Sequence, residues 1–333
     1  MKNVIITGAT GFYGHHLVRY LLATTDWNII AMGRENYAGN LNRLYELEEF
    51  RNNKDRVRII WHDLRSAIND VVGRQITRGE HVDYIFHTAA SSHVTRSIQD
   101  PMSFVYDNVV GTANLLEFAR KLEGLTRFLY FSTDEVFGPS AGDGYKFKPW
   151  DRYRAGNPYS ATKAGGEELC VAYENTFKIP LIISHCMNIL GERQHPEKYL
   201  PRIIKHIMSG EEVTVHTDSE RKNPCKRHYI IADEVSNALT FMLENGKVGE
   251  KYNIEGQKEL DNLELAKYVA GKLGMELKYK LVPAEVDRPG HDFEYALDNS
   301  ALRSLGYTEK HSFSEKLDKA IYWYRDNPYW LAL

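Results

Sequence analysis

A glycine-rich segment directly behind a short apolar run constrains this chain more than any other feature. Residues 8–14 read Gly-Ala-Thr-Gly-Phe-Tyr-Gly and follow the apolar residues 4–7 at the N-terminus. A strand, a glycine-rich turn and a helix in immediate succession begin a βαβ unit. Glycines let the backbone turn tightly and approach a ligand, and a helix N-terminus stabilises negative charge. The segment therefore predicts an α/β fold that holds the pyrophosphate of a dinucleotide.

Short β-rich runs and amphipathic stretches alternate through the first half of the chain. Helical patterns at 12–23, 102–121 and 159–177 separate the apolar runs. This rhythm predicts a doubly wound parallel sheet of the Rossmann type, with right-handed crossovers. The predicted strands are 4–7, 27–32, 57–61, 84–87, 128–131 and 181–185.

The rhythm changes after Gly191, where elements become shorter and prolines more frequent. We therefore predict a dinucleotide-binding domain over 1–190 and a smaller, mixed α/β substrate-binding lobe over 191–333. A helical pattern near 231–245 is expected to return to the first domain.

Composition excludes several classes of protein. Hydrophobic residues make up 43% and charged residues 26% of the chain, and the net charge is -3. This balance gives no electrostatic case for nucleic acid or an anionic membrane. The three cysteines, Cys170, Cys186 and Cys225, show neither paired nor metal-ligand spacing, so we expect no metal site and a reducing cytoplasm. We also expect neither a signal peptide nor a membrane span.

The end of the second predicted strand indicates which cofactor the site takes. An acidic residue there would bind the ribose 2′-hydroxyl of NAD and repel the 2′-phosphate of NADP. This chain has Gly33, which leaves room, and Arg34, which can pair with a phosphate. The cofactor is thus NAD(P), with NADP favoured over NAD. The predicted cofactor-binding residues are Gly8, Thr10, Gly11, Phe12, Tyr13, Gly14, Gly33, Arg34, Asp63, Leu64, Ala89, Ala90, Asn108, Ser132, Tyr159 and Lys163.

Two further segments carry a set of reactive groups. Thr133, Asp134 and Glu135 directly follow the predicted strand 128–131. Tyr159 and Lys163 stand at i, i+4 on one face of a predicted helix. A nearby ammonium and the positive nicotinamide ring together lower the pKa of a phenol, so Tyr159 is a candidate base for oxidising a sugar hydroxyl. One ionised and one protonated carboxyl provide a base and an acid for eliminating water.

At this point the chain resembles a known family. From residue 1 to about residue 298 it is similar to the nucleotide-sugar 4,6-dehydratases of the extended short-chain dehydrogenase/reductases, in particular the dTDP-glucose 4,6-dehydratases. The matching segments are Tyr37-Ala38-Gly39-Asn40, Ser92-His93-Val94, Arg96-Ser97-Ile98, Ser132-Thr133-Asp134-Glu135-Val136, Asn157-Pro158-Tyr159-Ser160-Ala161, Pro196-Glu197-Lys198 and Arg288-Pro289-Gly290-His291-Asp292.

The resemblance implies the reaction and the role of each residue. The enzyme would be a hydro-lyase that oxidises C4 of an NDP-hexose, eliminates water across C5 and C6 and returns the hydride to C6. Thr133 would contact the C4 hydroxyl, Asp134 would be the acid, Glu135 the base, and Tyr159 with Lys163 the oxidising pair. The substrate would be held by Ser92, His93, Asn188, Glu197, Lys198, Arg227, Arg288 and His291.

Three segments depart from the family pattern. Gly33-Arg34 replaces an acidic residue, residues 187–192 replace a more polar run, and residues 222–226 add a basic insertion before Arg227. The substrate therefore stays open among dTDP-glucose, UDP-glucose and UDP-N-acetylglucosamine.

Two other functions are compatible with parts of this pattern. A 4-epimerase or sugar oxidoreductase would share the glycine turn and Tyr159 but has no need of the Asp134-Glu135 pair. A non-catalytic dinucleotide sensor typically loses the Tyr or the Lys, and both are present here.

Helical stretches 102–121 and 159–177 are apolar on more than one side, which predicts a homodimer through a four-helix bundle.

Overall fold

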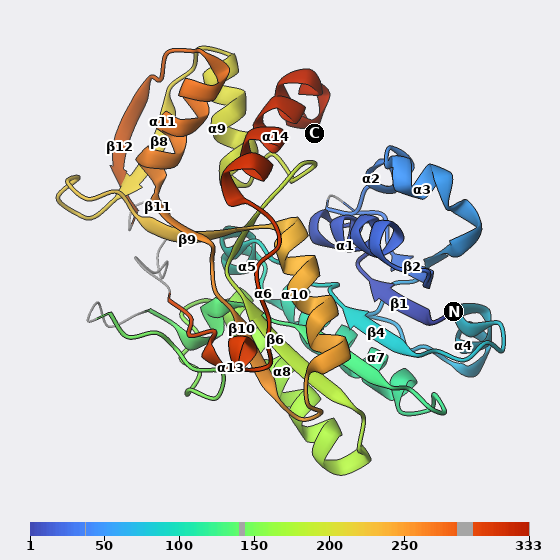
Figure 1. Cartoon of the computed structure of the whole chain (residues 1–333). Coiled ribbons are helices and arrows are strands. Elements are labelled where there is room, and N and C mark those ends of the chain that lie inside the picture. Colours follow the sequence, from blue (N-terminus) through green and yellow to red (C-terminus); the bar gives the residue numbers. More distant parts are fainter. Residues whose placement is uncertain (37, 140–143, 285–295, 333) are drawn as a thin grey trace.

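A parallel sheet forms the centre of the protein (Figure 1). The computed structural model describes residues 1–36, 38–139, 144–284 and 296–332. Within them, seven parallel strands run in the order β10-β6-β5-β4-β1-β2-β3, which confirms the predicted doubly wound fold. The strands are β1 (Asn3–Thr7), β2 (Asn28–Gly33), β3 (Val57–Trp61), β4 (Tyr84–His87), β5 (Arg127–Phe131), β6 (Leu181–Cys186) and β10 (Lys251–Ile254).

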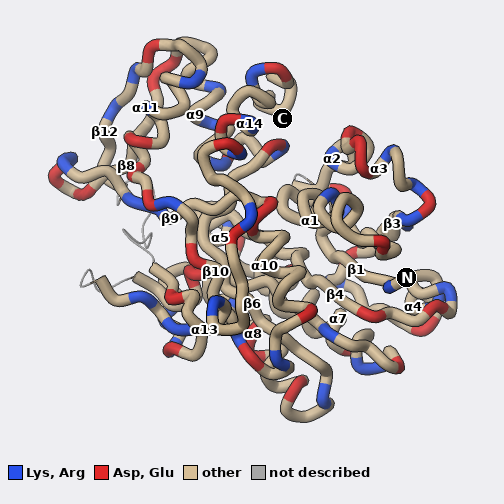
Figure 2. The backbone as a smooth tube through the Cα atoms, viewed as in Figure 1, with Lys and Arg blue, Asp and Glu red and all other residues tan. Residues whose placement is uncertain are grey.

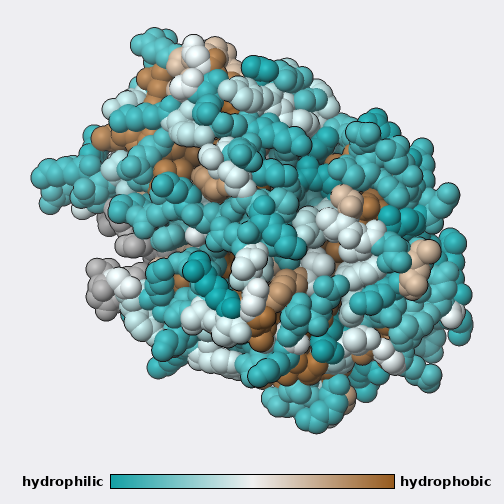
Figure 3. Space-filling model, viewed as in Figure 1, coloured by the Kyte–Doolittle hydropathy of each residue, from teal (hydrophilic) through white to brown (hydrophobic). Residues whose placement is uncertain are grey.

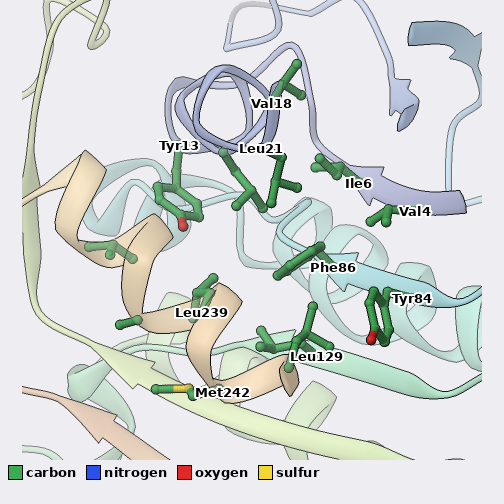
Figure 4. Close-up of a cluster of buried hydrophobic side chains, with 14 of the residues drawn as sticks. Val4, Ile6, Tyr13, Val18, Leu21, Tyr84, Phe86, Leu129, Leu239 and Met242 are labelled. Atoms are coloured by element: carbon green, nitrogen blue, oxygen red, sulfur yellow. The ribbon is translucent and has the colours of Figure 1, made fainter. Parts of the chain in front are cut away.

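Helices cover both faces of this sheet because its strands are apolar on both sides. One face carries α1 (Phe12–Thr24) and α10 (Ala232–Asn245), whose side chains pack over β1, β4 and β5 (Figure 4). The other face carries α4 (Asp70–Thr77), α7 (Gly111–Ala119) and α8 (Pro158–Phe177). Short helices α2 (Asn42–Tyr45) and α3 (Glu48–Asn52), and the 3-10 turn η1 (Lys54–Arg56), connect β2 to β3.

The helix predicted over 102–121 is not one continuous α-helix. After α5 (Val94–Gln99), the chain forms α6 (Pro101–Phe104), a π-helical segment η2 (Val105–Val110) and then α7. The wider turn of η2 is held by the Thr112 hydroxyl, which donates to the Asn108 carbonyl at 2.6 Å. Gly166 of α8 also approaches this carbonyl so closely that a Cβ would lie 2.6 Å from it. Close packing against α8 thus replaces the regular helical pattern.

The C-terminal part of the chain has its own small sheets and core. One sheet has the order β11-β9-β7, and a second pairs β8 with β12 in parallel. Strand β10 and helix α10 both follow residue 190 yet lie with the large sheet; this place was predicted for the helix but not for the strand. The remaining elements are β7 (Asn188–Leu190), α9 (Tyr199–Met208), β8 (Val213–Thr217), β9 (Lys226–Ile231), β11 (Lys258–Asp261), α11 (Asn262–Leu273), β12 (Tyr279–Pro283), α13 (Ser300–Ser304), α14 (Phe313–Asp326) and η4 (Pro328–Leu331).

The surface has no single dominant sign of charge. Basic and acidic residues are interspersed along the chain in Figure 2, and the face seen in Figure 3 is mainly hydrophilic. Among the described residues, no helix combines the length and the apolar character needed to cross a bilayer.

Candidate active site

A cavity of about 390 Å³ lies at the carboxyl ends of the central strands. Its floor comes from the turns after β1 and β4, where the strand order reverses, which is the place where doubly wound folds bind ligands. The segment from residue 186 to 200 contributes to its wall. Twenty-two of the predicted site residues line it, namely Gly8, Thr10, Gly11, Phe12, Tyr13, Gly14, Gly33, Arg34, Asp63, Leu64, Ala89, Ala90, Ser92, Ser132, Thr133, Asp134, Glu135, Tyr159, Lys163, Asn188, Glu197 and Lys198.

The glycine turn fits a pyrophosphate. Gly8 has a φ of 71°, and a Cβ there would lie 2.8 Å from the Ala89 Cα. A Cβ on Gly14 would lie 2.1 Å from the Gly8 carbonyl oxygen, so α1 can begin only if this position is glycine. Gly11, the N-cap of α1, has no side chain to occupy the first N–H groups of the helix. Those donors are therefore available to an anion in the cavity.

The ribose end of the cavity differs from what the sequence predicted. Gly33 was expected to leave room for a 2′-phosphate, but a Cβ at this position would lie 2.7 Å from the Thr10 hydroxyl. The Arg34 guanidinium contacts both carboxylate oxygens of Asp63 at 3.0 Å and one of Asp107 at 2.8 Å. The space beside Gly33 is filled by Thr10, and Arg34 already binds two carboxylates.

The turn after β5 carries the predicted acid and base. It is a 3-10 helix, η3 (Asp134–Phe137), and the Thr133 hydroxyl donates to Asp134 Oδ1 at 3.0 Å. Asp134 is buried, its Oδ2 has no hydrogen-bond partner among the described residues, and burial with the neighbouring Glu135 raises its pKa to about 7. Glu135 Oε2 accepts a hydrogen bond from Asn157 Nδ2 at 3.2 Å. The two carboxyls thus have different environments, as an acid and a base require.

Tyr159 and Lys163 are placed by the first turns of α8. Asn157 caps this helix in a capping box with Ser160, and Pro158 occupies the first turn. Both side chains are buried at the cavity. The Lys163 ammonium donates to the Phe131 carbonyl oxygen at 2.7 Å.

The protein's own groups do not lower the pKa of Tyr159, and the prediction invoked the positive nicotinamide ring beside Lys163. Burial raises the pKa of Tyr159, the Glu135 carboxylate raises it further, and a hydrogen bond with Thr133 opposes both. Burial also lowers the pKa of Lys163 to about 7, which reduces the charge available to stabilise a phenolate. Both groups lose water in this cavity, which penalises each charged form, so a Tyr159 phenolate depends on the positive nicotinamide ring as well as on Lys163.

The predicted substrate residues fall into three groups. Asn188, Glu197, Lys198 and Ser92 line the cavity, and Lys198 Nζ donates to the Ser92 carbonyl oxygen at 3.1 Å. His93 and Arg227 lie beside it. His93 Nε2 is 3.7 Å from Glu197 Oε2, and the charge of Arg227 partly opposes the rise in the pKa of Asp134. Arg288 and His291 lie outside the described residues.

Asn108, predicted to contact the cofactor, does not line the cavity. Its side chain lies in η2, where Nδ2 donates to the Ser91 carbonyl and to the Thr162 hydroxyl, both at 3.0 Å. It braces the turn after β4 against α8.

Comparison with known proteins decides the family. A family model described as GDP-mannose 4,6 dehydratase matches residues 5–320. The chain belongs to this family. It is therefore an extended short-chain dehydrogenase/reductase. Its relatives identify it as a nucleotide-sugar 4,6-dehydratase, which is a dinucleotide-dependent hydro-lyase. Both assignments confirm the predictions from the sequence.

Three relatives show how far the similarity extends. A dTDP-glucose 4,6-dehydratase from Neisseria gonorrhoeae is 33% identical over 98% of this chain and 96% of its own length. A trifunctional protein from Arabidopsis thaliana, named for its UDP-glucose 4,6-dehydratase, epimerase and reductase activities, is 33% identical over 99% of this chain and 48% of its own length. The solved DesIV, a dTDP-glucose 4,6-dehydratase from Streptomyces venezuelae with NAD bound, has a TM-score of 0.87 and 33% identity, covering 98% of both chains.

Sequence reasoning missed several residues that this dehydratase brings to the cavity. Arg43 is buried there, and its Nη1 donates to the Thr10 carbonyl oxygen at 3.1 Å. His195 directly precedes the recognised Pro-Glu-Lys segment, and Asp107 directly precedes Asn108, so proximity to a motif was an available signal for these two. Nothing in the sequence around Arg43 distinguished it from a surface residue.

Proposed function

We propose that this dehydratase converts a dTDP- or UDP-linked glucose into the corresponding 4-keto-6-deoxy sugar with Thr133, Asp134, Glu135, Tyr159 and Lys163 as its catalytic residues. One observation supports this assignment above all. The buried Asp134, with a pKa near 7, and the hydrogen-bonded Glu135 open onto the same cavity as Tyr159 and Lys163. A 4-epimerase has no use for this carboxyl pair.

The proposed steps divide the proton transfers among these side chains. Tyr159 takes the proton from the C4 hydroxyl while Thr133 positions that hydroxyl. The ketone at C4 then acidifies the C5 proton, which Glu135 removes. Asp134 protonates the C6 oxygen as the C6–O bond breaks, so water leaves and a C5=C6 double bond forms. Glu135 finally returns its proton to C5. When bound, the dinucleotide would supply the hydride chemistry at both ends of the reaction, since C4 loses a hydride as its hydroxyl becomes a ketone and C6 gains one as the double bond is reduced.

We propose NAD as the cofactor in preference to NADP. The solved relative DesIV contains NAD, and no relative reported above supports the NADP preference that Gly33 and Arg34 predicted. The contacts of Arg34 with Asp63 and Asp107 agree with this choice, because a 2′-phosphate would compete with two carboxylates. Mass spectrometry of the cofactor released from the purified, denatured enzyme tests it, and NADP as the main species would contradict it.

We further propose a homodimer located in the cytoplasm. Ile98, Met102 and Tyr106 are exposed by 40%, 54% and 48% on α5, α6 and η2, which pack beside α8. Exposed apolar groups on adjoining helices favour pairing with a second copy. The three free, buried cysteines agree with a reducing compartment. Light scattering that shows a monomer at micromolar concentration would rule out the dimer.

The substrate proposal is tested by incubating the enzyme with dTDP-glucose, UDP-glucose and UDP-N-acetylglucosamine. A 4-keto-6-deoxy product develops absorbance in alkali, whereas a 4-epimer does not. We expect absorbance with at least one of the first two substrates. Formation of an epimer without absorbance would show that the enzyme is a 4-epimerase instead.

A further inference from the structure

Two arginines and two aspartates form a charge cluster at the ribose end of the cavity. Arg34 contacts Asp63 and Asp107 as described above, and Arg65 Nε donates to Asp107 Oδ1 at 2.7 Å. The Ser91 hydroxyl donates to Asp107 Oδ2 at 2.6 Å. Asp107 is therefore the centre of the cluster, with donors from three separate segments of the chain.

Asp107 is held as a carboxylate. Its side chain is 8% exposed, and burial alone would raise its pKa. The hydrogen bonds from Arg65 and Ser91 and the charge of Arg34 outweigh burial and bring the pKa below the ordinary value. The cluster thus has two positive and two negative charges, and it offers no net attraction to an incoming dianion.

Space alone does not exclude a 2′-phosphate from this end of the cavity. A second, open hollow adjoins it, and Arg34 and Asp63 line both. The hollow is otherwise lined by Glu35, Leu41, Trp61 and His62. This hollow is separate from the space that Thr10 fills beside Gly33, and it has room for a group larger than a hydroxyl, so we attribute discrimination between the two cofactors to charge.

We propose that Asp107 is a specificity-determining residue of this enzyme, and that it excludes NADP by neutralising Arg34. The inference rests on the proposed use of NAD and adds the residue that enforces it. Arg34 directly follows strand β2, where a guanidinium can pair with a 2′-phosphate, but its donors contact Asp63 and Asp107. An acidic residue at position 33, the usual device, is not needed, because a carboxylate from η2 cancels the positive charge that would attract the phosphate.

The test measures the dissociation constants of NAD and NADP for the parent, Asp107→Asn, Arg34→Ala and the double variant. We expect Asp107→Asn to tighten NADP binding at least tenfold relative to NAD, because the cluster then carries a net positive charge and Arg34 is held by Asp63 alone. The double variant should lose this gain. Arg34→Ala alone should leave the ratio of the two constants within about threefold of the parent. Glu35→Gln, which removes an exposed carboxylate beside the same arginine, is the matched control and should also stay within threefold.

Each outcome bears on one proposal. A ratio that does not move in Asp107→Asn, or a gain that persists in the double variant, overturns the role of Asp107. An equal tightening of NADP binding in Glu35→Gln overturns it too, because the loss of any nearby negative charge would then be enough. If Asp107→Asn does not fold, Arg34→Ala still tests the proposal. A tenfold weakening of NADP binding relative to NAD binding in that variant would show that Arg34 already binds the 2′-phosphate in the parent, which overturns the role of Asp107. The parent enzyme's released cofactor tests the choice of NAD independently.

Discussion

Asn157 Nδ2 donates a hydrogen bond to Glu135 Oε2 at 3.2 Å. The same Asn157 side chain accepts from the Ser160 N–H at 2.9 Å and so caps helix α8. One residue therefore fixes the helix that carries Tyr159 and orients the proposed base of the elimination step. These two tasks can be separated, because serine is as good an N-cap as asparagine but has no amide to donate.

We predict that Asn157→Ser slows product formation about tenfold with little loss of stability. A hydrogen bond to a charged group contributes about 1.5–3 kcal/mol, so its removal disorders Glu135. Asn157→Ala is the matched variant and should lose the same activity and, in addition, about 1 kcal/mol of unfolding free energy. Steady-state rates and urea denaturation measure both quantities. A parental rate in Asn157→Ser would show that Asn157 only caps the helix.

Glu135→Gln should abolish release of the 4-keto-6-deoxy product but not oxidation at C4. The variant keeps the side-chain shape and an oxygen for Asn157, while it loses the base for the C5 proton. Addition of substrate should therefore still produce the absorbance of the reduced nicotinamide cofactor. Product released at the parental rate would refute the role assigned to Glu135.

Tyr159→Phe should stop the reaction one step earlier. Without the phenol oxygen, no group takes the proton from the C4 hydroxyl, so the bound cofactor stays oxidised when substrate is added. The two variants therefore give opposite results in the same absorbance assay. Reduced cofactor in Tyr159→Phe would mean that another residue, Thr133 or Lys163, accepts this proton.

Six of the seven described strands of the large sheet, and the segment with the proposed acid and base, could be predicted because their signals are local. Val4, Ile5 and Ile6 form a continuous apolar run, as a strand buried on both faces requires, and Thr133 to Glu135 are adjacent in the chain. The ribose end could not be predicted in the same way. Arg34 and Asp107 are 73 residues apart, and only the folded sheet and η2 bring them together. The Thr10 hydroxyl likewise fills the space beside Gly33 through tertiary packing.

The pH dependence of elimination should follow Asp134. Its pKa is raised to about 7, so the side chain is protonated and able to donate to C6 below that value, and it loses this ability as the pH rises above 7. We expect product formation to fall up to tenfold per pH unit there. Lys163 has a pKa lowered to about 7 and titrates in the same range. The variant Asp134→Asn distinguishes the two groups. If Asp134 causes the loss of product formation above pH 7, the residual activity of this variant should not fall in that range.

Restoring the family's acidic residue at position 33 should fail unless Thr10 changes with it. A Cβ at Gly33 would lie 2.7 Å from the buried Thr10 hydroxyl, and a β-branched side chain has little freedom to move. Gly33→Asp should therefore cost about 1–3 kcal/mol of unfolding free energy and weaken NAD binding. Thr10→Ala removes the obstructing hydroxyl, so the double variant should recover both properties and bind NAD more tightly than NADP. Denaturation curves and NAD titrations of the two variants measure this, with Thr10→Ala as the control. If Gly33→Asp is as stable as the parent, the Thr10 side chain moves aside for the new side chain.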